Sequence, residues 1–206
     1  ALLAGRTAGA LKRQLEHAGA QPAALARALY AWSRQRRTDV GTWRNLYGNP
    51  RDVDLFRRWL TYFLDERGKR DLVEGYGDSH LRHVAGFMTY RFLRIGTPRR
   101  TWARGHEGIR TPAELAAYAD AHWAVQAVIR MERLEDDVAD ILRSLGHDVS
   151  GDELRIRRRT NSSERLDTSV YYDDATADLF AREEALLVER YGYAPPGSPA
   201  RLAADG

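Results

Sequence analysis

The stretch from residue 157 to residue 173 concentrates side chains that can grip an anion. Residues 157–165 read Arg-Arg-Arg-Thr-Asn-Ser-Ser-Glu-Arg, and Tyr-Tyr-Asp follows at 171–173. Asparagine, serine and arginine supply donors that converge on a phosphate, and the arginine fork can bind it through two hydrogen bonds. The pattern predicts a phosphate-binding loop before a helix. Its alternative is a solvated basic loop in which Asp173 or Asp174 only caps the helix.

The segment before this loop predicts the elements that must position it. Residues 111–114 read Thr-Pro-Ala-Glu, a strong helix start with a hydroxyl cap, a proline and an acid, and that helix reaches residue 122 or 123. Residues 125–131 are short and largely apolar, as a buried parallel strand would be. Residues 134–145 are amphipathic and end at Gly146, which suits a left-handed helix cap.

This order of motifs resembles the C-terminal part of a sulfotransferase that uses 3′-phosphoadenylyl sulfate (PAPS), of the bacterial carbohydrate type. The resemblance covers residues 80–193, with specific motifs from residue 125 onward. It implies a fold that is mainly α with a small parallel β component, a partial P-loop-like α/β sulfotransferase fold. The matching motifs are a strand entering Glu132-Arg-Leu134, a helix ending in Leu145-Gly146, Asn161-x-Ser163-x-Arg165, the tyrosine pair, and Tyr191-Gly192-Tyr193.

The resemblance also implies which residues bind the nucleotide. Ser163 and Arg165 would contact its 3′-phosphate, Asn161 would shape the loop, and Glu132 would brace it. These positions match the family pattern in order and spacing.

A second loop of the family, of the Lys-Thr-Gly-Thr type, holds the 5′-phosphosulfate with its lysine and its backbone amides. Residues 5–9 resemble it distantly, with Arg6 at the lysine position and Thr7, Ala8 and Gly9 after it. The resemblance therefore adds Arg6, Thr7 and Gly9 to the cofactor-binding candidates. A complete phosphosulfate loop is not evident, so the chain is expected to be incomplete or inactive as a transferase by itself.

The acceptor side of the reaction maps to residues 87–93, which resemble the segment that lines the acceptor cleft of bacterial members. Met88 and Arg91 are the implied substrate contacts. The sequence does not identify the catalytic base, and His80 and His83, three residues apart, are candidates for it. The alternative is that the two histidines only pack in the protein. No further ligands have the spacing of a metal site, so none is expected.

The remaining sequence predicts a helical protein. Helices are expected at 7–38, 52–66, 81–93 and 174–191, and loops at 38–50 and 96–110 because of their glycines and prolines. We expect one domain over 1–193, with a helical part (1–110), an αβα unit with the nucleotide loop (111–193), and a flexible tail at 194–206.

Composition limits the function classes. The 206 residues are 43% hydrophobic and 30% charged, which indicates a folded, soluble protein rather than a disordered one. The absence of cysteine removes disulfides and thiol nucleophiles and fits a cytoplasmic location. No apolar run reaches the roughly 18 residues of a membrane span. A net charge of +3 is too small to argue for nucleic acid as the partner.

The sequence therefore predicts a sulfotransferase-like protein that transfers a sulfuryl group from PAPS to a hydroxyl, in a carbohydrate acceptor. The alternative is a non-catalytic helical module that binds an anionic partner through residues 157–165. A third hypothesis is a nucleic-acid binder that uses Arg99, Arg100, Arg104 and residues 157–159.

Overall fold

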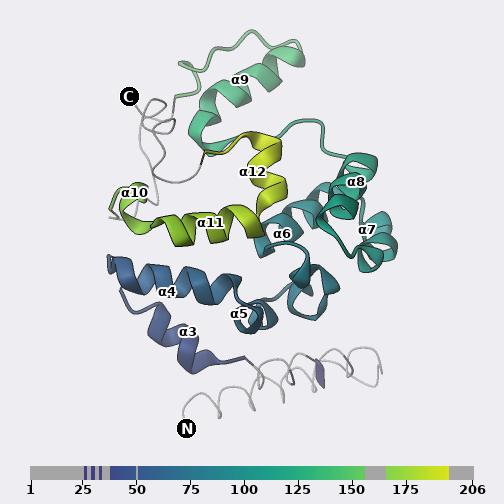
Figure 1. The fold of residues 1–206 in the computed structure, drawn as a ribbon. Helices are drawn as coiled ribbons and strands as arrows, with labels where there is room; N and C mark the ends of the chain where they lie inside the picture. Colours follow the sequence, from purple (N-terminus) through teal and green to yellow (C-terminus); the bar gives the residue numbers. More distant parts are fainter. Residues whose placement is uncertain are drawn as a thin grey trace, which may run out of the picture.

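The computed structural model describes residues 26, 29–30, 33, 38–49, 51–155 and 166–194. Helix accounts for 68% of the structure, which confirms the mainly α class. Figure 1 shows short helices stacked in several directions, with α4 and α11 side by side and α9 at the far side of α12. None of the described helices is both long and apolar enough to cross a membrane.

The described elements are α-helices and short 3₁₀ helices (η). They are α3 (Val40–Leu46), α4 (Val53–Leu64), α5 (Glu66–Asp71), η1 (Tyr76–Asp78), η2 (His80–His83), α6 (Phe87–Gly96), α7 (Arg99–Gly105), η3 (His106–Gly108), α8 (Pro112–His122), η4 (Met131–Arg133), α9 (Leu134–Ser144), α10 (Thr168–Tyr171), α11 (Asp174–Glu183) and α12 (Ala185–Tyr191).

Side-chain caps explain where several of these helices begin. Thr111 and Glu114 form the predicted reciprocal capping box of α8, with Pro112 as its first residue. At the end of α9, Gly146 has a φ of 88°, the left-handed conformation predicted for it. Asp173 accepts a hydrogen bond from the Thr176 amide and so caps α11. The sequence offered Asp173 or Asp174 as the cap of this helix, and the structure shows that it is Asp173.

Two segments that were expected to be loops contain helices. Residues 38–50 include α3, because the Asp39 side chain accepts the Thr42 amide and stabilises the first turn. Residues 96–110 include α7 and η3, where burial of Trp102 in the core compensates for the flanking glycines. The predicted final helix is also divided, into α11 and α12, at the buried residue Glu184.

The predicted strand at 125–131 is not found, and no strand occurs among the described residues. The segment runs without helix between α8 and η4, and Val125 and Ile129 are 37% and 42% exposed. Its start is held by the Ala124 amide, which donates to the Gly96 carbonyl oxygen at 2.9 Å. A parallel strand needs a neighbour to accept and donate its backbone hydrogen bonds, and the described part of the chain offers no such neighbour.

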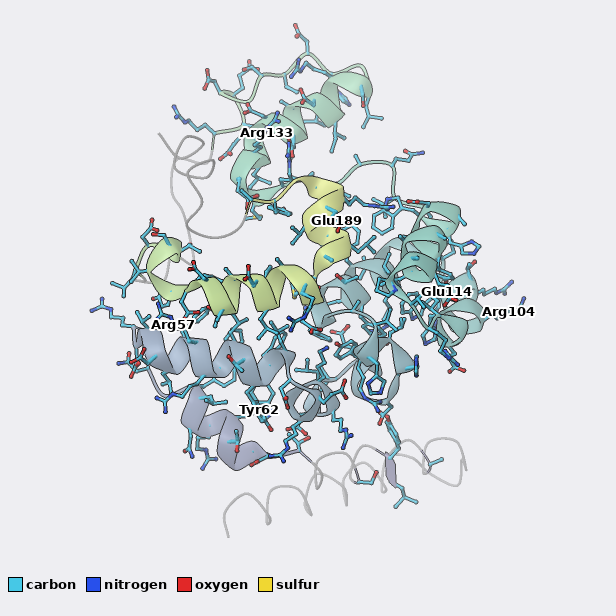
Figure 2. All side chains as sticks on the ribbon, in the orientation of Figure 1. Arg57, Tyr62, Arg104, Glu114, Arg133 and Glu189 are labelled. Atoms are coloured by element: carbon cyan, nitrogen blue, oxygen red, sulfur yellow. The ribbon has the colours of Figure 1, made fainter. Side chains whose placement is uncertain are left out.

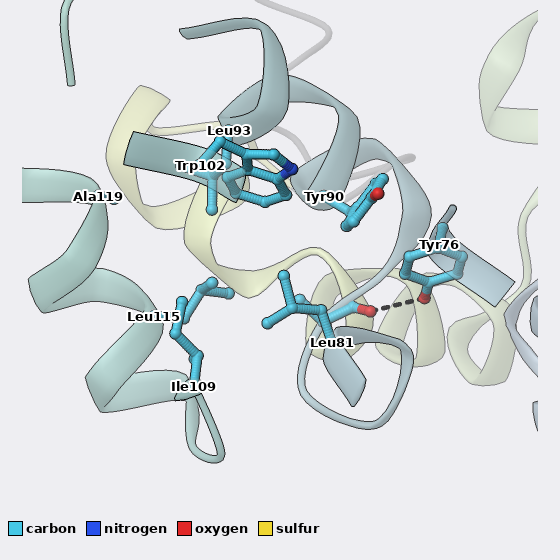
Figure 3. Close-up of a cluster of buried hydrophobic side chains, with 9 residues drawn as sticks. Tyr76, Leu81, Tyr90, Leu93, Trp102, Ile109, Leu115 and Ala119 are labelled. Atoms are coloured by element: carbon cyan, nitrogen blue, oxygen red, sulfur yellow. Dashed lines mark hydrogen bonds between the residues drawn. The ribbon is translucent and has the colours of Figure 1, made fainter. Parts of the chain in front are cut away.

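The principal core joins η1, η2, α6, α7 and α8 (Figure 3). Leu93 and Ala119 are fully buried, and Tyr76, also fully buried, donates its hydroxyl proton to the Ala85 carbonyl oxygen at 2.7 Å. This bond matters because an unpaired buried hydroxyl costs on the order of 1–3 kcal/mol. The core residues are Tyr76, Leu81, Ala85, Tyr90, Leu93, Trp102, Ile109, Leu115 and Ala119.

The start of α6 is capped from a distant part of the chain. Gly86 precedes the helix and has no side chain to cap it; instead the Glu184 carboxylate accepts the amides of Met88 and Thr89, at 3.0 and 2.7 Å. It also accepts the Thr89 hydroxyl at 2.6 Å. A Cβ on Gly86 would lie 2.1 Å from the carboxylate oxygen, so only glycine leaves room for this cap.

An ion pair between buried Lys69 and partly buried Glu183 fastens the same region to α5. Lys69 is 5% exposed, and its ammonium group lies 2.5 Å from Glu183 and donates to the Arg82 carbonyl oxygen at 3.0 Å. The Gly86 amide donates to the Glu183 carbonyl oxygen at 2.6 Å. The junction of α11 and α12 therefore holds α5, η2 and α6 together.

Candidate functional site

A cleft of about 760 Å³ opens between the turn after α5 and the helices α6 and α7. Its walls combine acids, arginines and aromatic rings on elements that the core holds in place. The lining residues are Glu74, Gly75, Asp78, Ser79, Tyr90, Arg94, Ile95, Arg99, Trp102, Ala103, His106 and Glu107. We call this the Glu74 cleft.

Glu74 has an unusual backbone at the edge of this cleft. Its φ of 65° makes it the one non-glycine residue with a positive φ in the described part of the chain. The left-handed conformation costs a residue with a Cβ about 1–2 kcal/mol, and such strain is concentrated at functional sites. The next residue, Gly75, is also left-handed, with a φ of 88°. The two residues form a tight turn that presents the Glu74 carboxylate at the cleft.

The Glu74 carboxylate holds two arginines of α6. Arg94 lies 2.6 Å from one carboxylate oxygen and Arg91 lies 3.4 Å from the other. The Glu74 carbonyl oxygen accepts the Tyr90 hydroxyl at 2.9 Å. Glu74 is partly exposed at 28% and Arg94 at 42%, so a polar ligand can reach the pair and exchange partners with it.

An aromatic wall faces these charges. The rings of Trp102 and His106 stack with centroids 4.6 Å apart and an interplanar angle of 5°. The Tyr90 ring meets Trp102 edge to face at 5.3 Å. Burial raises the pKa of Tyr90, so its hydroxyl keeps its proton at neutral pH. A flat aromatic wall beside carboxylate and guanidinium groups suits a ligand with both an apolar face and many hydroxyls.

The two candidate histidines lie together next to this cleft. In η2 the rings of His80 and His83 are 5.3 Å apart, because residues three apart superpose in a 3₁₀ helix. His83 contacts Glu66 through Nδ1 at 2.8 Å. His80 directly follows Ser79, a lining residue, and η2 contacts η3. Partial desolvation, and then the positive charges nearby, lower the pKa of His80 and favour the neutral ring that can accept a proton.

The two predicted acceptor contacts, Met88 and Arg91, lie in different parts of α6. Arg91 pairs with Glu74 at the edge of the cleft, as described above, although it is not among the lining residues. Met88 is 46% exposed and belongs to the opposite end of the helix, where its amide donates to Glu184. The structure therefore brings Arg91 to the Glu74 cleft and leaves Met88 away from it.

The predicted nucleotide contacts lie outside the described residues. This holds for Asn161, Ser163 and Arg165 and also for the N-terminal candidates Arg6, Thr7 and Gly9.

The described chain resumes just after this loop, at Leu166. The Leu166 amide donates to the Tyr171 hydroxyl oxygen at 3.2 Å. The Tyr171 ring packs on Phe56 of α4 at 5.0 Å, and Tyr172 packs on the same ring at 5.4 Å. Arg57 donates to the Tyr171 carbonyl oxygen at 3.1 Å. In the described residues the tyrosine pair is thus a structural anchor for the end of the predicted loop.

The segment before α9 is held by an aspartate. The Asp137 carboxylate accepts the Arg130 amide at 2.9 Å, and the arginine side chains at 130 and 133 lie near it. This amide hydrogen bond is the main cause that lowers the pKa of Asp137; burial opposes it, and the charges of Arg133 and Arg130 lower the pKa further. Glu132 is exposed and makes no such contact with the described residues. Its predicted role as a brace therefore stays a prediction.

Glu74, Trp102 and His106 are residues that sequence reasoning missed as site candidates. The Glu74-Gly75 pair signals a turn, but a positive φ at Glu74 cannot be read from residue types. Trp102 and His106 fell in a segment that we expected to be a loop. No cluster of three metal-ligating side chains occurs among the described residues.

Comparison of the chain with models of protein families, with curated proteins and with solved structures found no match.

Proposed function

We propose that this protein is sulfotransferase-like and transfers a sulfuryl group from PAPS to a hydroxyl of a carbohydrate acceptor. In this proposal the Glu74 cleft receives the acceptor. The nucleotide is bound by Asn161, Ser163 and Arg165, in a domain of the partial P-loop-like α/β sulfotransferase type. The protein would use PAPS as its donor, need no metal and work in the cytoplasm.

The composition of the Glu74 cleft is the observation that supports it as the binding site of the carbohydrate acceptor. Sugar rings present an apolar face of C–H groups, which stacks on flat aromatic rings. The ring available here is that of His106, which is partly exposed and stacks on the buried ring of Trp102. Their hydroxyls donate to carboxylates and accept from arginines, the roles available to Glu74 and Arg94. The cleft offers both surfaces within one cavity of about 760 Å³, within the usual size range of ligand pockets.

Transfer also needs a base that takes the proton of the acceptor hydroxyl as the sulfur–oxygen bond to the acceptor forms. His80 fits this role, because its lowered pKa keeps it neutral and Ser79 beside it lines the cleft. The charge that develops on the leaving 5′-phosphate would be stabilised by a cation, the part that the resemblance implies for Arg6 at the lysine position of the phosphosulfate loop.

Nucleotide binding tests the proposal. Titration of the chain with 3′-phosphoadenosine 5′-phosphate, followed by calorimetry, is expected to give saturable one-to-one binding. Arg165→Ala should weaken it about tenfold or more, since it removes a charged, bidentate partner of a phosphate. The matched control is Arg155→Ala, ten residues earlier and exposed, which should change the affinity less than twofold.

The same titration separates the proposal from its alternative. A non-catalytic helical module that recognises an anionic partner through residues 157–165 would show no saturable binding of this nucleotide. Equal losses in Arg165→Ala and Arg155→Ala would also contradict the proposal, because they would indicate general charge attraction rather than a phosphate site.

A further inference from the structure

A second cleft, of about 340 Å³, lies between α7 and α8 on the other side of α7 from the Glu74 cleft. Arg99, Trp102, Ala103 and His106 line the Glu74 cleft, following the i, i+3, i+4, i+7 pattern of one helix face. The opposite face of α7 lines the second cleft, together with two residues of α8. The lining residues are Arg100, Thr101, Arg104, Gly105, Tyr118 and His122. We call this the Arg104 cleft.

The Arg104 cleft has no carboxylate in its lining, whereas the Glu74 cleft has three. Arg100 and Arg104 are one helical turn apart on the same face, and both are exposed. Neither is paired with a carboxylate of the described residues, although most of the other arginines around the core are. Figure 2 shows the Arg104 side chain reaching outward from α7. The Arg104 cleft is therefore lined by two guanidinium groups whose positive charge is not balanced by a carboxylate of the described residues.

The floor of the cleft carries an unused hydroxyl. The Tyr118 hydroxyl is buried and has no hydrogen-bond partner among the described residues. Burial also raises the pKa of Tyr118, so the group keeps its proton and can donate it. A buried hydroxyl without a partner costs about 1–3 kcal/mol, and a bound acceptor would remove that cost.

The close packing of α7 on α8 places this hydroxyl at the cleft. A Cβ built on Gly105 would lie 2.7 Å from the edge of the Tyr118 ring and 3.4 Å from its hydroxyl oxygen. The His122 ring meets the Tyr118 ring edge to face at 4.7 Å. Glycine at position 105 therefore permits an approach that gathers Tyr118, His122 and the two arginines around one space.

We propose that the Arg104 cleft binds a tetrahedral oxyanion, the sulfate or phosphate group of a ligand. Its donors are the guanidinium groups of Arg100 and Arg104 and the hydroxyl groups of Thr101 and Tyr118. All of them donate, and the arginine forks match the spacing of two oxygens on sulfur or phosphorus. The inference does not depend on the proposed transferase activity, because none of these residues belongs to the Glu74 cleft or to the predicted nucleotide loop.

Titration with sulfate tests it on the full chain. NMR or calorimetric titration with sodium sulfate, at constant ionic strength set with sodium chloride, is expected to show saturable binding. Arg100→Ala and Arg104→Ala should each weaken it about tenfold, and Tyr118→Phe, which keeps the ring, about threefold. The matched control is Arg155→Ala, which removes an exposed arginine that lines neither cleft and should change the affinity less than twofold.

Titrations with other anions identify the source of the oxyanion. Inorganic phosphate and methyl sulfate replace sulfate in the same titration, so a preference for methyl sulfate indicates a sulfate ester as the ligand. Sodium acetate, with a planar anion, should bind at least fivefold more weakly. The effect of Arg165→Ala on nucleotide binding tests the proposed function separately.

Two results would overturn the inference. One is sulfate binding that depends equally on Arg155 and Arg104, which would indicate attraction to net charge alone. The other is the absence of saturation by sulfate, phosphate and methyl sulfate in a chain whose circular dichroism shows it to be folded.

Discussion

Two glutamates hold opposite ends of α6 in different ways. Glu184 is 1% exposed, and its carboxylate accepts three hydrogen bonds at the start of the helix. Glu74 is partly exposed, sits in a strained left-handed conformation, and pairs with arginines of the later turns. The Glu184 carboxylate is buried, and its hydrogen bonds are all made within the protein. The Glu74 carboxylate can be reached by solvent, so it can exchange its arginine partners for a ligand.

This difference indicates that Glu184 stabilises the fold and that Glu74 belongs to a binding site. A buried carboxylate whose acceptors are all used stabilises one arrangement of the chain and has no capacity left for a ligand. An exposed ion pair contributes little to folding, about 0.2–1 kcal/mol, so its partners can be given to a ligand at small cost. Changes at Glu184 should therefore reduce stability, and changes at Glu74 should reduce binding.

The largest effect is expected from Glu184→Ala. It leaves the amides of Met88 and Thr89 without their acceptor and makes a cavity, so the free energy of unfolding should fall by about 3–5 kcal/mol. Urea denaturation measures it. The matched control is Glu189→Ala, five residues along and exposed (Figure 2), which should change stability by less than about 0.5 kcal/mol. Equal, small losses in both variants would mean that the cap of α6 is not important.

The next effect concerns pH. Burial raises the pKa of Glu184, although hydrogen bonds from Thr89 and Met88 oppose this effect. The folded protein therefore holds this proton more tightly than the unfolded chain. As pH rises from the ordinary carboxyl pKa to the raised one, the unfolded chain loses its proton first and stability falls.

Glu184→Gln checks this sign, because glutamine does not titrate. The difference in unfolding free energy between the wild type and Glu184→Gln should shift against the wild type as pH rises through that window and level off above it. A difference that is constant from pH 4 to pH 8 would show that burial does not raise the pKa of Glu184.

A smaller effect is expected at the strained turn. Glu74→Ala and Glu74→Gly both remove the carboxylate, but only glycine adopts a φ of 65° without strain. Glu74→Gly should therefore be more stable than Glu74→Ala by about 1 kcal/mol. Both variants should lose oligosaccharide binding to the same extent. If Glu74→Ala were the more stable of the two, the left-handed conformation at this position would be wrong.

The smallest effect on folding is expected from Arg94→Ala. The pair with Glu74 is exposed, so the loss of stability should stay below about 1 kcal/mol. Affinity for a sugar ligand should still drop several-fold, because a donor at the cleft is gone. Arg143→Ala on α9 removes a more exposed ion pair and serves as the control. A loss of stability without a loss of affinity would show that Arg94 stabilises the fold and does not bind the ligand.

Local signals were sufficient for much of the fold. The start of α8, the glycine that ends α9, and α4 follow from capping residues and apolar periodicity, which act over one or two turns. The division of the last helix at Glu184 was missed because its cause lies about 95 residues away, at the start of α6. A periodic pattern does not reveal which carboxylate will cap another helix.

The candidate site depended still more on distant contacts. The resemblance pointed to α6, and Arg91 lies at the Glu74 cleft, but the glutamate that pairs with it comes from a turn after another helix. Burial of Trp102 makes α7 a wall of two clefts, although its flanking glycines predicted a loop. The strand at 125–131 was predicted from its apolar residues alone, and sheet formation depends on a neighbour as well.

The most direct test of the acceptor site follows the indole N–H resonance of Trp102 by NMR, assigned with Trp102→Phe, during titration with neutral and uronic-acid-bearing hexasaccharides. At least one hexasaccharide should shift this resonance in a saturable way in the wild type, and Glu74→Gly should reduce the affinity several-fold. An indole resonance that none of the hexasaccharides moves, in a folded protein, would contradict the assignment of the Glu74 cleft as the carbohydrate site.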